Sequence, residues 1–117
     1  MVYTIMEKSD HSGFENPVLR DKLGTIDGAI AITKTESKGA RIFWKGANQH
    51  IWSSIVHLDE SVEAPKSLNM GEIQGPIAAI HQKNDLVQLL WKGKNGKVWG
   101  AKETSHQSWP GPSEFRF

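Results

Sequence analysis

The chain has 117 residues, of which 38% are hydrophobic and 23% charged, and its formal net charge is +1. This length fits one ordinary globular domain. The near balance of charges excludes the clustered positive field that nucleic acid or an anionic membrane needs, so no nucleic-acid partner is predicted. Because the sequence has no cysteine, it also excludes disulfides, thiolate metal sites and a cysteine nucleophile.

The N-terminal segment lacks a basic stretch followed by an apolar one, and no run approaches the roughly 20 apolar residues of a membrane span. We therefore expect a soluble protein that is made in the cytoplasm without a signal peptide and does not insert into membranes. Release by a non-classical route stays open.

The tryptophans reveal an internal repeat. A shift of 47 residues aligns 24–70 with 71–117 without a gap. It produces 12 identical pairs, where chance at this composition would produce about three. These pairs include Trp44 with Trp91, Trp52 with Trp99, Gly46 with Gly93, and Asn48 with Asn95.

Residues 1–23 are similar to the second half of the same unit. Tyr3 falls at the position of Trp52 and Trp99, and Pro17 matches the later prolines after a one-residue adjustment. The chain thus holds about two and a half repeats. The predicted organisation is a partial unit at 1–23 and full units at 24–70 and 71–117.

Each unit has the pattern of four short antiparallel strands. Small and β-branched residues between glycines predict an inner strand, and two apolar runs predict the next two. A proline, tolerated at a sheet edge, then introduces a brief outer strand. In chain order, the expected strands are 28–33, 41–45, 51–56 and 66–69 in the first unit, and 75–80, 87–92 and 98–103 in the second.

The connection between the second and third strands differs between the units. Asn95-Gly96 lies between two apolar runs and predicts a hairpin with a type I′ turn, because both residues accept a positive φ. Gln49 replaces that glycine in the first unit. We therefore expect a looser turn, or one of another type, there.

Four short strands repeated every 47 residues are typical of β-propeller blades. A β-sandwich would not require a gapless repeat, and a helical repeat needs a 3.6-residue apolar period that these segments lack. We predict an all-β fold of four-stranded propeller blades. Because propellers close with at least four blades, a homo-oligomeric ring is expected, with different faces of the blade paired head to tail. A dimer would supply five blades, and a trimer or larger ring stays open.

Three segments resemble a known family: 42–52, 89–99, and the downstream stretch Ser108-Trp109-Pro110-Gly111-Pro112. They are similar to the tandem-repeat propeller lectins of the Photorhabdus-lectin type, and also to tachylectin-like and tectonin-like propellers. The resemblance implies a non-enzymatic carbohydrate-binding protein with several sites. Lys45 and Lys92 stand where the family usually has arginine, and Ser61-Val62 lacks the downstream tryptophan.

The residues support sugar binding independently. A pyranose has an apolar C–H face and a rim of hydroxyls, so its receptor needs an exposed aromatic ring and a few polar partners, and tryptophan supplies the largest ring. The alternative role for these tryptophans is packing between blades. The alternative for the lysines and glutamates is a solvent-exposed charge without a ligand. The candidate sugar-binding residues are Trp52, Trp99, Tyr3, Trp44, Trp91, Trp109, Lys45, Lys92, Glu7 and Glu103.

The sequence argues against catalysis. No Gly-x-Ser-x-Gly motif is present, the adjacent pair Asp59-Glu60 is poorly placed for two facing carboxylates, and the Gly-rich stretches lack the spacing of a phosphate-binding loop. The five histidines have no close ligand spacing, so neither a metal nor a cofactor is expected. They are His11, His50, His57, His81 and His106.

The leading hypothesis is therefore a multivalent lectin that binds a monosaccharide or short glycan of the fucose, galactose or N-acetylhexosamine type. The alternative is a non-catalytic propeller module that binds a protein partner.

Overall fold

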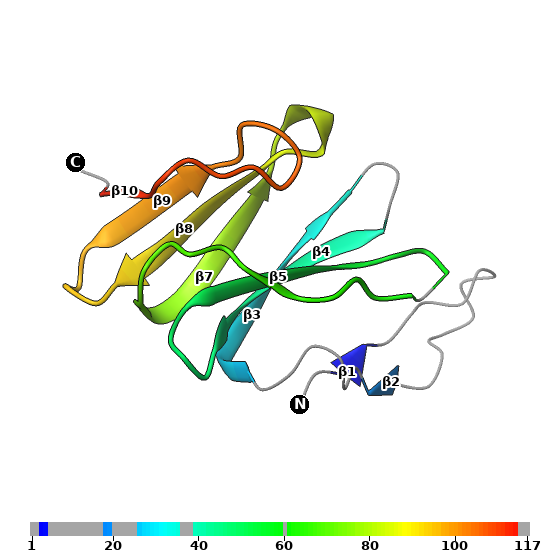
Figure 1. The fold of residues 1–117 in the computed structure, drawn as a ribbon, viewed down its shortest axis with the longest axis horizontal. Coiled ribbons are helices and arrows are strands. Elements are labelled where there is room, and N and C mark those ends of the chain that lie inside the picture. Colours follow the sequence, from blue (N-terminus) through cyan, green and yellow to red (C-terminus); the bar gives the residue numbers. More distant parts are fainter. Residues whose placement is uncertain (1–2, 5–17, 20–25, 36–38, 60, 115–117) are drawn as a thin grey trace.

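The computed structural model describes residues 3–4, 18–19, 26–35, 39–59 and 61–114. This part of the chain is all β, with two four-stranded antiparallel sheets, a two-stranded pair and a short 3-10 turn at Lys83–Asp85. Figure 1 shows the two sheets beside each other. Within the described residues, no helix is long and apolar enough to cross a bilayer.

The first sheet is an antiparallel meander in chain order. β3 (Ile26–Lys34) pairs with β4 (Ala40–Gly46), and β4 pairs with β5 (Ile51–Val56). The short outer strand β6 (Lys66–Ser67) pairs with β5. Pro65 directly precedes β6, at an edge where its missing N–H removes no interstrand hydrogen bond.

The second sheet has the same strand arrangement as the first sheet, and each of its strands lies 47 residues later in the chain. A register shift recurs as well, between Ile26 and Ile30 in the first sheet and between Ile73 and Ile77 in the second. The predicted all-β fold, with four antiparallel strands per unit, is confirmed. The strands of the second sheet are β7 (Ile73–His81), β8 (Val87–Gly93), β9 (Val98–Lys102) and β10 (Ser113–Glu114).

The N-terminal pair consists of β1 (Tyr3–Thr4) and β2 (Val18–Leu19). Tyr3 lies opposite Leu19 in this pair. In each four-stranded sheet, the third and fourth strands are paired in the same register as β1 and β2. The pair β1–β2 therefore matches the third and fourth strands of a sheet. The corresponding opposed residues are Trp52 with Ser67, and Trp99 with Glu114.

The turns between the second and third strands have the same geometry in both sheets. The N–H of Gly96 donates to the carbonyl of Gly93 at 2.9 Å, and that of Gln49 donates to the carbonyl of Gly46 at 3.0 Å. Gly96 has a φ of 81° and Gln49 a φ of 69°, whereas Asn95 keeps a negative φ. The predicted type I′ turn and the looser first turn are therefore both wrong.

The asparagine side chain explains this turn. Asn95 Oδ1 accepts the N–H of Lys97 at 3.1 Å, and Asn48 Oδ1 accepts the N–H of His50 at 3.2 Å. Such a local hydrogen bond favours a turn in which only the residue after asparagine is left-handed. Gln49 adopts that conformation, although glycine would do so more easily.

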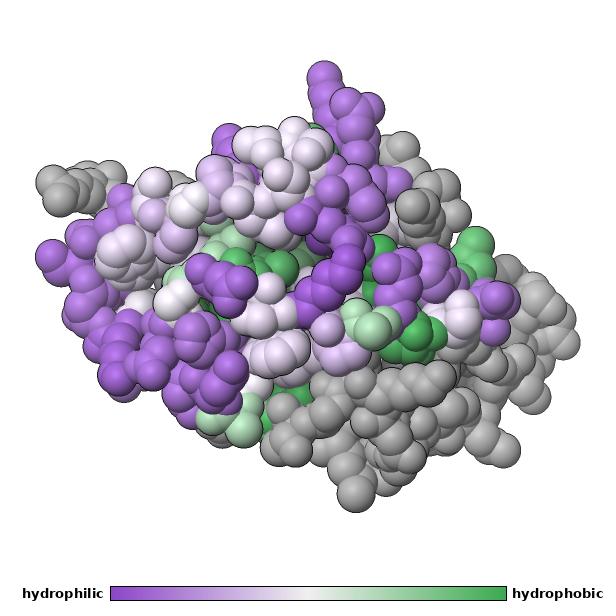
Figure 2. Space-filling view, in the orientation of Figure 1, coloured by the Kyte–Doolittle hydropathy of each residue, from purple (hydrophilic) through white to green (hydrophobic). Residues whose placement is uncertain are grey.

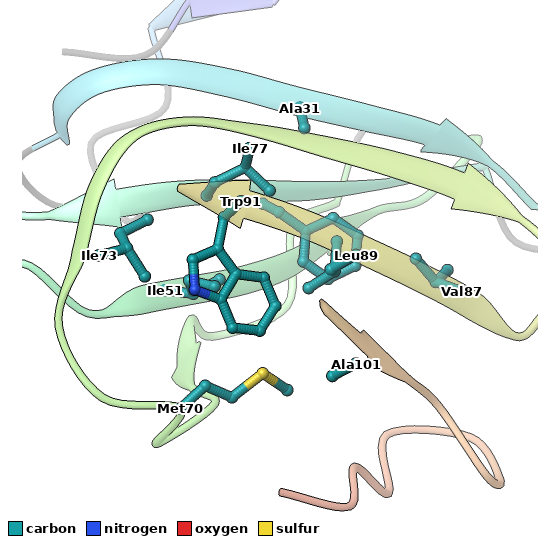
Figure 3. Packing of buried hydrophobic residues seen from close by; sticks show 10 residues of the cluster. Ala31, Ile51, Met70, Ile73, Ile77, Val87, Leu89, Trp91 and Ala101 are labelled. Atoms are coloured by element: carbon teal, nitrogen blue, oxygen red, sulfur yellow. The ribbon is translucent and has the colours of Figure 1, made fainter. Parts of the chain in front are cut away.

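The main hydrophobic core lies between the two sheets. Successive strand residues alternate faces, so Val87, Leu89 and Trp91 of β8 all point toward the first sheet, as Figure 3 shows. The first sheet contributes Ala31, Phe43 and Ile51 from its facing side. A smaller cluster occupies the opposite face of the first sheet and contains Ile42, Trp44 and Val56.

A buried ion pair also joins the sheets. Arg41 Nη1 lies 2.7 Å from Glu103 Oε1, and the two side chains are 2% and 0% exposed. Glu103 Oε1 also accepts the N–H of Val87 at 3.1 Å. The Arg41 guanidinium lies over the rings of Phe43 and Trp109, at 5.3 and 6.0 Å from their centroids. Glu103 thus acts as a structural carboxylate, buried away from any ligand at the surface.

Candidate functional site

The candidate site is a pocket of about 510 Å³ at one end of the second sheet. It lies between the segment 69–72, which joins the two sheets, and the turn between β8 and β9. Trp91, Trp99 and Pro112 contribute apolar walls, and Glu72, Lys94 and Asn95 contribute polar groups. It therefore combines apolar and hydrogen-bonding groups in one pocket.

The turn fixes the orientation of Trp99. Its indole Nε1–H donates to Asn95 Oδ1 at 3.1 Å. Gly93 lies against the same ring, where a β-carbon would overlap Trp99 Cδ1 and Nε1. Position 93 thus has no room for a β-carbon, and the hydrogen bond to Asn95 already engages the indole N–H within the protein. Trp99 can offer a ligand its ring surface.

The base of the pocket is apolar. Trp91 is 4% exposed and Met70 is 6% exposed, and both belong to the core between the sheets. Figure 3 shows the Met70 side chain beside the Trp91 ring. Gly71 adopts a φ of 79° in the adjoining segment, a conformation that glycine adopts without steric cost. The core is thus continuous with the wall of the pocket.

An ion pair forms part of the rim. Lys94 Nζ lies 2.5 Å from Glu72 Oε2, and both side chains reach solvent. The hydrogen bond from Lys94, followed by its positive charge, holds the pKa of the Glu72 carboxyl below its ordinary value of 4.5. Above that pH the rim therefore offers a carboxylate as acceptor and an ammonium group as donor.

The structure brings two of the predicted residues, Trp91 and Trp99, into this pocket. Trp44 is 1% exposed and packs in the small cluster on the other face of the first sheet. Trp109 lies between the sheets, with its ring 6.1 Å from that of Phe43 in an edge-to-face arrangement. These two tryptophans thus have packing roles.

Of the remaining candidates, the two lysines lie outside this pocket. Lys92 is exposed on the face opposite Trp91, and Lys45 is half-buried. Tyr3 is described only through its backbone pairing, and Glu7 lies outside the described residues. The sequence did not identify Glu72, Lys94 or Met70 as site residues, because only the fold brings the segment 69–72 next to the turn that carries Lys94.

The first sheet has a partial counterpart of the pocket. Trp52 Nε1–H donates to Asn48 Oδ1 at 3.0 Å, and a β-carbon on Gly46 would overlap the Trp52 ring. Ala47 occupies the position of Lys94, however, so this counterpart lacks the ammonium group. The two units therefore share the tryptophan arrangement and differ in the charged rim.

Other polar clusters have local roles. His57 pairs with Glu63 at 2.8 Å, and His81 pairs with Asp85 at 3.1 Å. Asp59 accepts hydrogen bonds from the hydroxyl and then the backbone N–H of Ser61, and these lower the pKa of its carboxyl. Among the residues that the structure describes, no three His, Asp or Glu side chains gather where they could hold a metal ion.

No protein-family model matches this chain. No curated protein matches it either.

Proposed function

We propose that this chain is a non-catalytic carbohydrate-binding protein, and that the pocket lined by Trp91 and Trp99 takes a monosaccharide or a terminal glycan residue. The observation that carries the proposal is a tryptophan ring fixed by Asn95 and Gly93 next to the Glu72–Lys94 ion pair. An aromatic surface beside hydrogen-bonding groups matches the apolar face and hydroxyl rim of a pyranose. The similarity to propeller lectins favours the same function.

The chemistry of the pocket assigns a part to each group. The apolar C–H face of the sugar packs on the ring surface of Trp99, whose N–H remains on Asn95. Ring hydroxyls donate to the Glu72 carboxylate and accept from the Lys94 ammonium group. A charge-assisted hydrogen bond is about twice as strong as a neutral one. Together these contacts favour a neutral, polyhydroxylated ring over a flat apolar ligand.

The architecture that we propose for this function is a β-propeller, in which the two sheets are adjacent blades. Two observations support it: the sheets are 47-residue repeats of one another, and they pack through opposite faces of the repeated unit. Further blades from other copies of the chain complete the ring, which makes the protein multivalent. Several weak sites in one assembly raise the overall affinity for a glycan-bearing surface.

The test is a glycan-array screen, followed by titration of tryptophan fluorescence with fucose, galactose and N-acetylhexosamines. We expect Trp99→Ala to abolish binding at this pocket. Trp52→Ala is the matched control, because Trp52 has the same Asn and Gly neighbours but alanine, Ala47, at the position of Lys94. We expect the affinity of the second-unit pocket to be unchanged in that variant.

Two results would refute the proposal at different levels. Silence across the whole array, with the protein folded, would exclude carbohydrate binding and favour the alternative, a propeller module that binds a protein partner. Equal losses for Trp99→Ala and Trp52→Ala would show that the charged rim does not define the site.

A further inference from the structure

A hollow lies on the outer face of the second sheet, the face turned away from the first sheet. It measures about 310 Å³, at the lower end of the range of about 300–1,000 Å³ for small-ligand pockets. Gly100 pairs with Leu90 on one side and with Ser113 on the other, so these three residues share the outer face. Among the described residues, none lines both this hollow and the pocket beside Trp99.

The outer face around the hollow is open and partly apolar. Ile80 is 43% exposed and Val98 is 37% exposed. Their strand partners, Gln88 and Lys92, lie on the same face as Leu90. By contrast, the described residues on the side of the molecule seen in Figure 1 are mostly hydrophilic or intermediate in hydropathy, as Figure 2 shows. Apolar side chains on the outer face are thus available for contact.

The first sheet shows what occupies the corresponding place there. Trp109, from the loop between β9 and β10, packs on the side of the first sheet that faces the second. Its ring lies 6.1 Å from that of Phe43, edge to face, and borders a space of about 220 Å³ with Ser53 and Lys66. The Arg41 guanidinium lies 6.0 Å from the centroid of the Trp109 ring. At this position of the repeat, the occupant is therefore a tryptophan side chain.

The residues around the hollow correspond to those around Trp109. All three replacements shorten the side chain, so the second sheet keeps the frame of the site and leaves more room for a ring. A shift of 47 residues relates Leu90, Gly100 and Ser113 to Phe43, Ser53 and Lys66, in that order.

A cation is available at the hollow as well. Gln88 replaces Arg41 in the second unit, so the guanidinium over the ring is missing. Lys102, however, is exposed and lines the hollow. A lysine ammonium group is attracted to the face of an aromatic ring, as a guanidinium is. Lys102 can therefore take the part that Arg41 has beside Trp109.

The charge on the outer face favours an acidic ligand. Lys92 and Lys102 are both exposed on this face. The carboxylate of Glu114, which lines the hollow, lies 3.5 Å from the ammonium group of Lys97. The two lysines of the face thus attract a carboxylate in a bound segment, and salt weakens this attraction because the charges are exposed.

Neither full unit of a second copy offers a free tryptophan for this position. Val62 stands at the position of Trp109 in the first unit. In the second unit, Trp109 itself packs against Phe43 of its own chain. A tryptophan for the hollow therefore comes from a different polypeptide.

We propose that this hollow binds a tryptophan side chain of another protein, in a segment where acidic residues flank a tryptophan–proline pair like Trp109-Pro110. The indole packs over Gly100 and Leu90, the Lys102 ammonium group lies over the ring, and the flanking carboxylates pair with the lysines of the face. The proposal does not depend on sugar binding. Because a further blade would pack on the same face, a bound peptide also competes with closure of the proposed ring.

The test is titration of a fluorescein-labelled peptide, Asp-Ser-Trp-Pro-Gly-Pro-Asp, followed by fluorescence anisotropy. Its five central residues copy residues 108–112, and a second peptide has alanine in place of tryptophan. Ser113→Leu fills the hollow beside Gly100, and Lys102→Gln removes the ammonium group. Lys94→Gln is the crossed control, because Lys94 is an exposed lysine of the other pocket. Circular dichroism verifies the folding of each variant.

The proposal predicts a specific pattern of affinities. The parent protein and Lys94→Gln bind the peptide alike. The alanine peptide binds about tenfold more weakly or worse, because buried tryptophans are typical hot spots of binding, and Ser113→Leu causes a similar loss because the hollow is filled. Lys102→Gln weakens binding by about two- to fivefold, the range expected for an exposed cation over an aromatic ring.

Three results would overturn the inference: no binding of the peptide by the folded parent protein, equal binding of the alanine peptide, or a Ser113→Leu variant that binds like the parent. Self-association that Ser113→Leu abolishes, in a protein that does not bind the peptide, would identify a second copy as the occupant instead. Sugar titration of the same variants keeps the two proposals apart, because Lys94→Gln should weaken sugar binding and Ser113→Leu should leave it unchanged.

Discussion

The buried Arg41–Glu103 ion pair offers the most direct test of the packing between the sheets. Arg41→Ala leaves the Glu103 carboxylate inside the interface without its cation, because that side chain is 0% exposed. Removing one partner of a buried pair costs about 3–5 kcal/mol. The free energy of unfolding of a natural domain is only about 5–15 kcal/mol, so the variant should lose a large part of its stability.

The assay is equilibrium unfolding in urea, followed by tryptophan fluorescence. With a slope of about 2 kcal/mol per M, the expected loss lowers the midpoint by about 2 M. The double variant Arg41→Met with Glu103→Met should recover most of this loss, since well-packed apolar residues often replace a buried pair without penalty. Lys94→Ala breaks the exposed Glu72–Lys94 pair and should leave the midpoint nearly unchanged.

The comparison of these variants tests whether the Arg41–Glu103 pair is buried between the two sheets. If Arg41→Ala were to shift the midpoint no more than Lys94→Ala does, the ion pair would be solvated in solution and the two sheets would not pack as described. A double variant no more stable than Arg41→Ala would show instead that the pair fixes the geometry of the interface and cannot be replaced by apolar packing.

Two further predictions concern the turn and the rim. Gln49→Gly should stabilise the protein by about 1 kcal/mol, because a non-glycine residue at a positive φ is strained. Gly96→Ala should destabilise the protein by a similar amount in the same urea assay. An unchanged stability in either variant would contradict the left-handed conformation of the turn. The pKa of Glu72 is lowered from its ordinary value of 4.5, so the carboxyl is charged from neutral pH down to about pH 5. Its contribution to sugar binding should therefore be constant over that range and be lost only as the pH falls through the lowered pKa. Glu72→Gln should remove this pH dependence, and a fluorescence titration in which it persists would locate the titrating group elsewhere.

Much of the fold could be predicted from the repeat. Trp44 with Trp91 and Trp52 with Trp99 fixed the 47-residue period, and the strand 51–56 was predicted at the bounds that β5 has. Periodicity succeeds here because a repeated unit must form the same interstrand hydrogen bonds each time. The turn type was not predictable, because a side-chain hydrogen bond from Asn95 to the backbone decided it.

The candidate site was only half predictable. Trp99 was identified because tryptophan after a polar turn suggests a ring at the surface, but the sequence could not distinguish it from Trp109, which packs between the sheets. Glu103 looked like a free carboxylate until the fold placed it against Arg41, 62 residues away. A residue's chemistry is local, whereas its availability depends on what covers it.

By itself, then, the sequence determined the strands, their order and their repetition, since these follow from local patterns of side-chain size, branching and turn residues. Only the tertiary structure decided which face of each strand is covered. Alternation assigns Phe43 and Trp44 to opposite faces but not to the interior or the surface. The packing of the two sheets made that assignment, assembled the pocket from separate loops, and left Ile32 and Ile80 exposed.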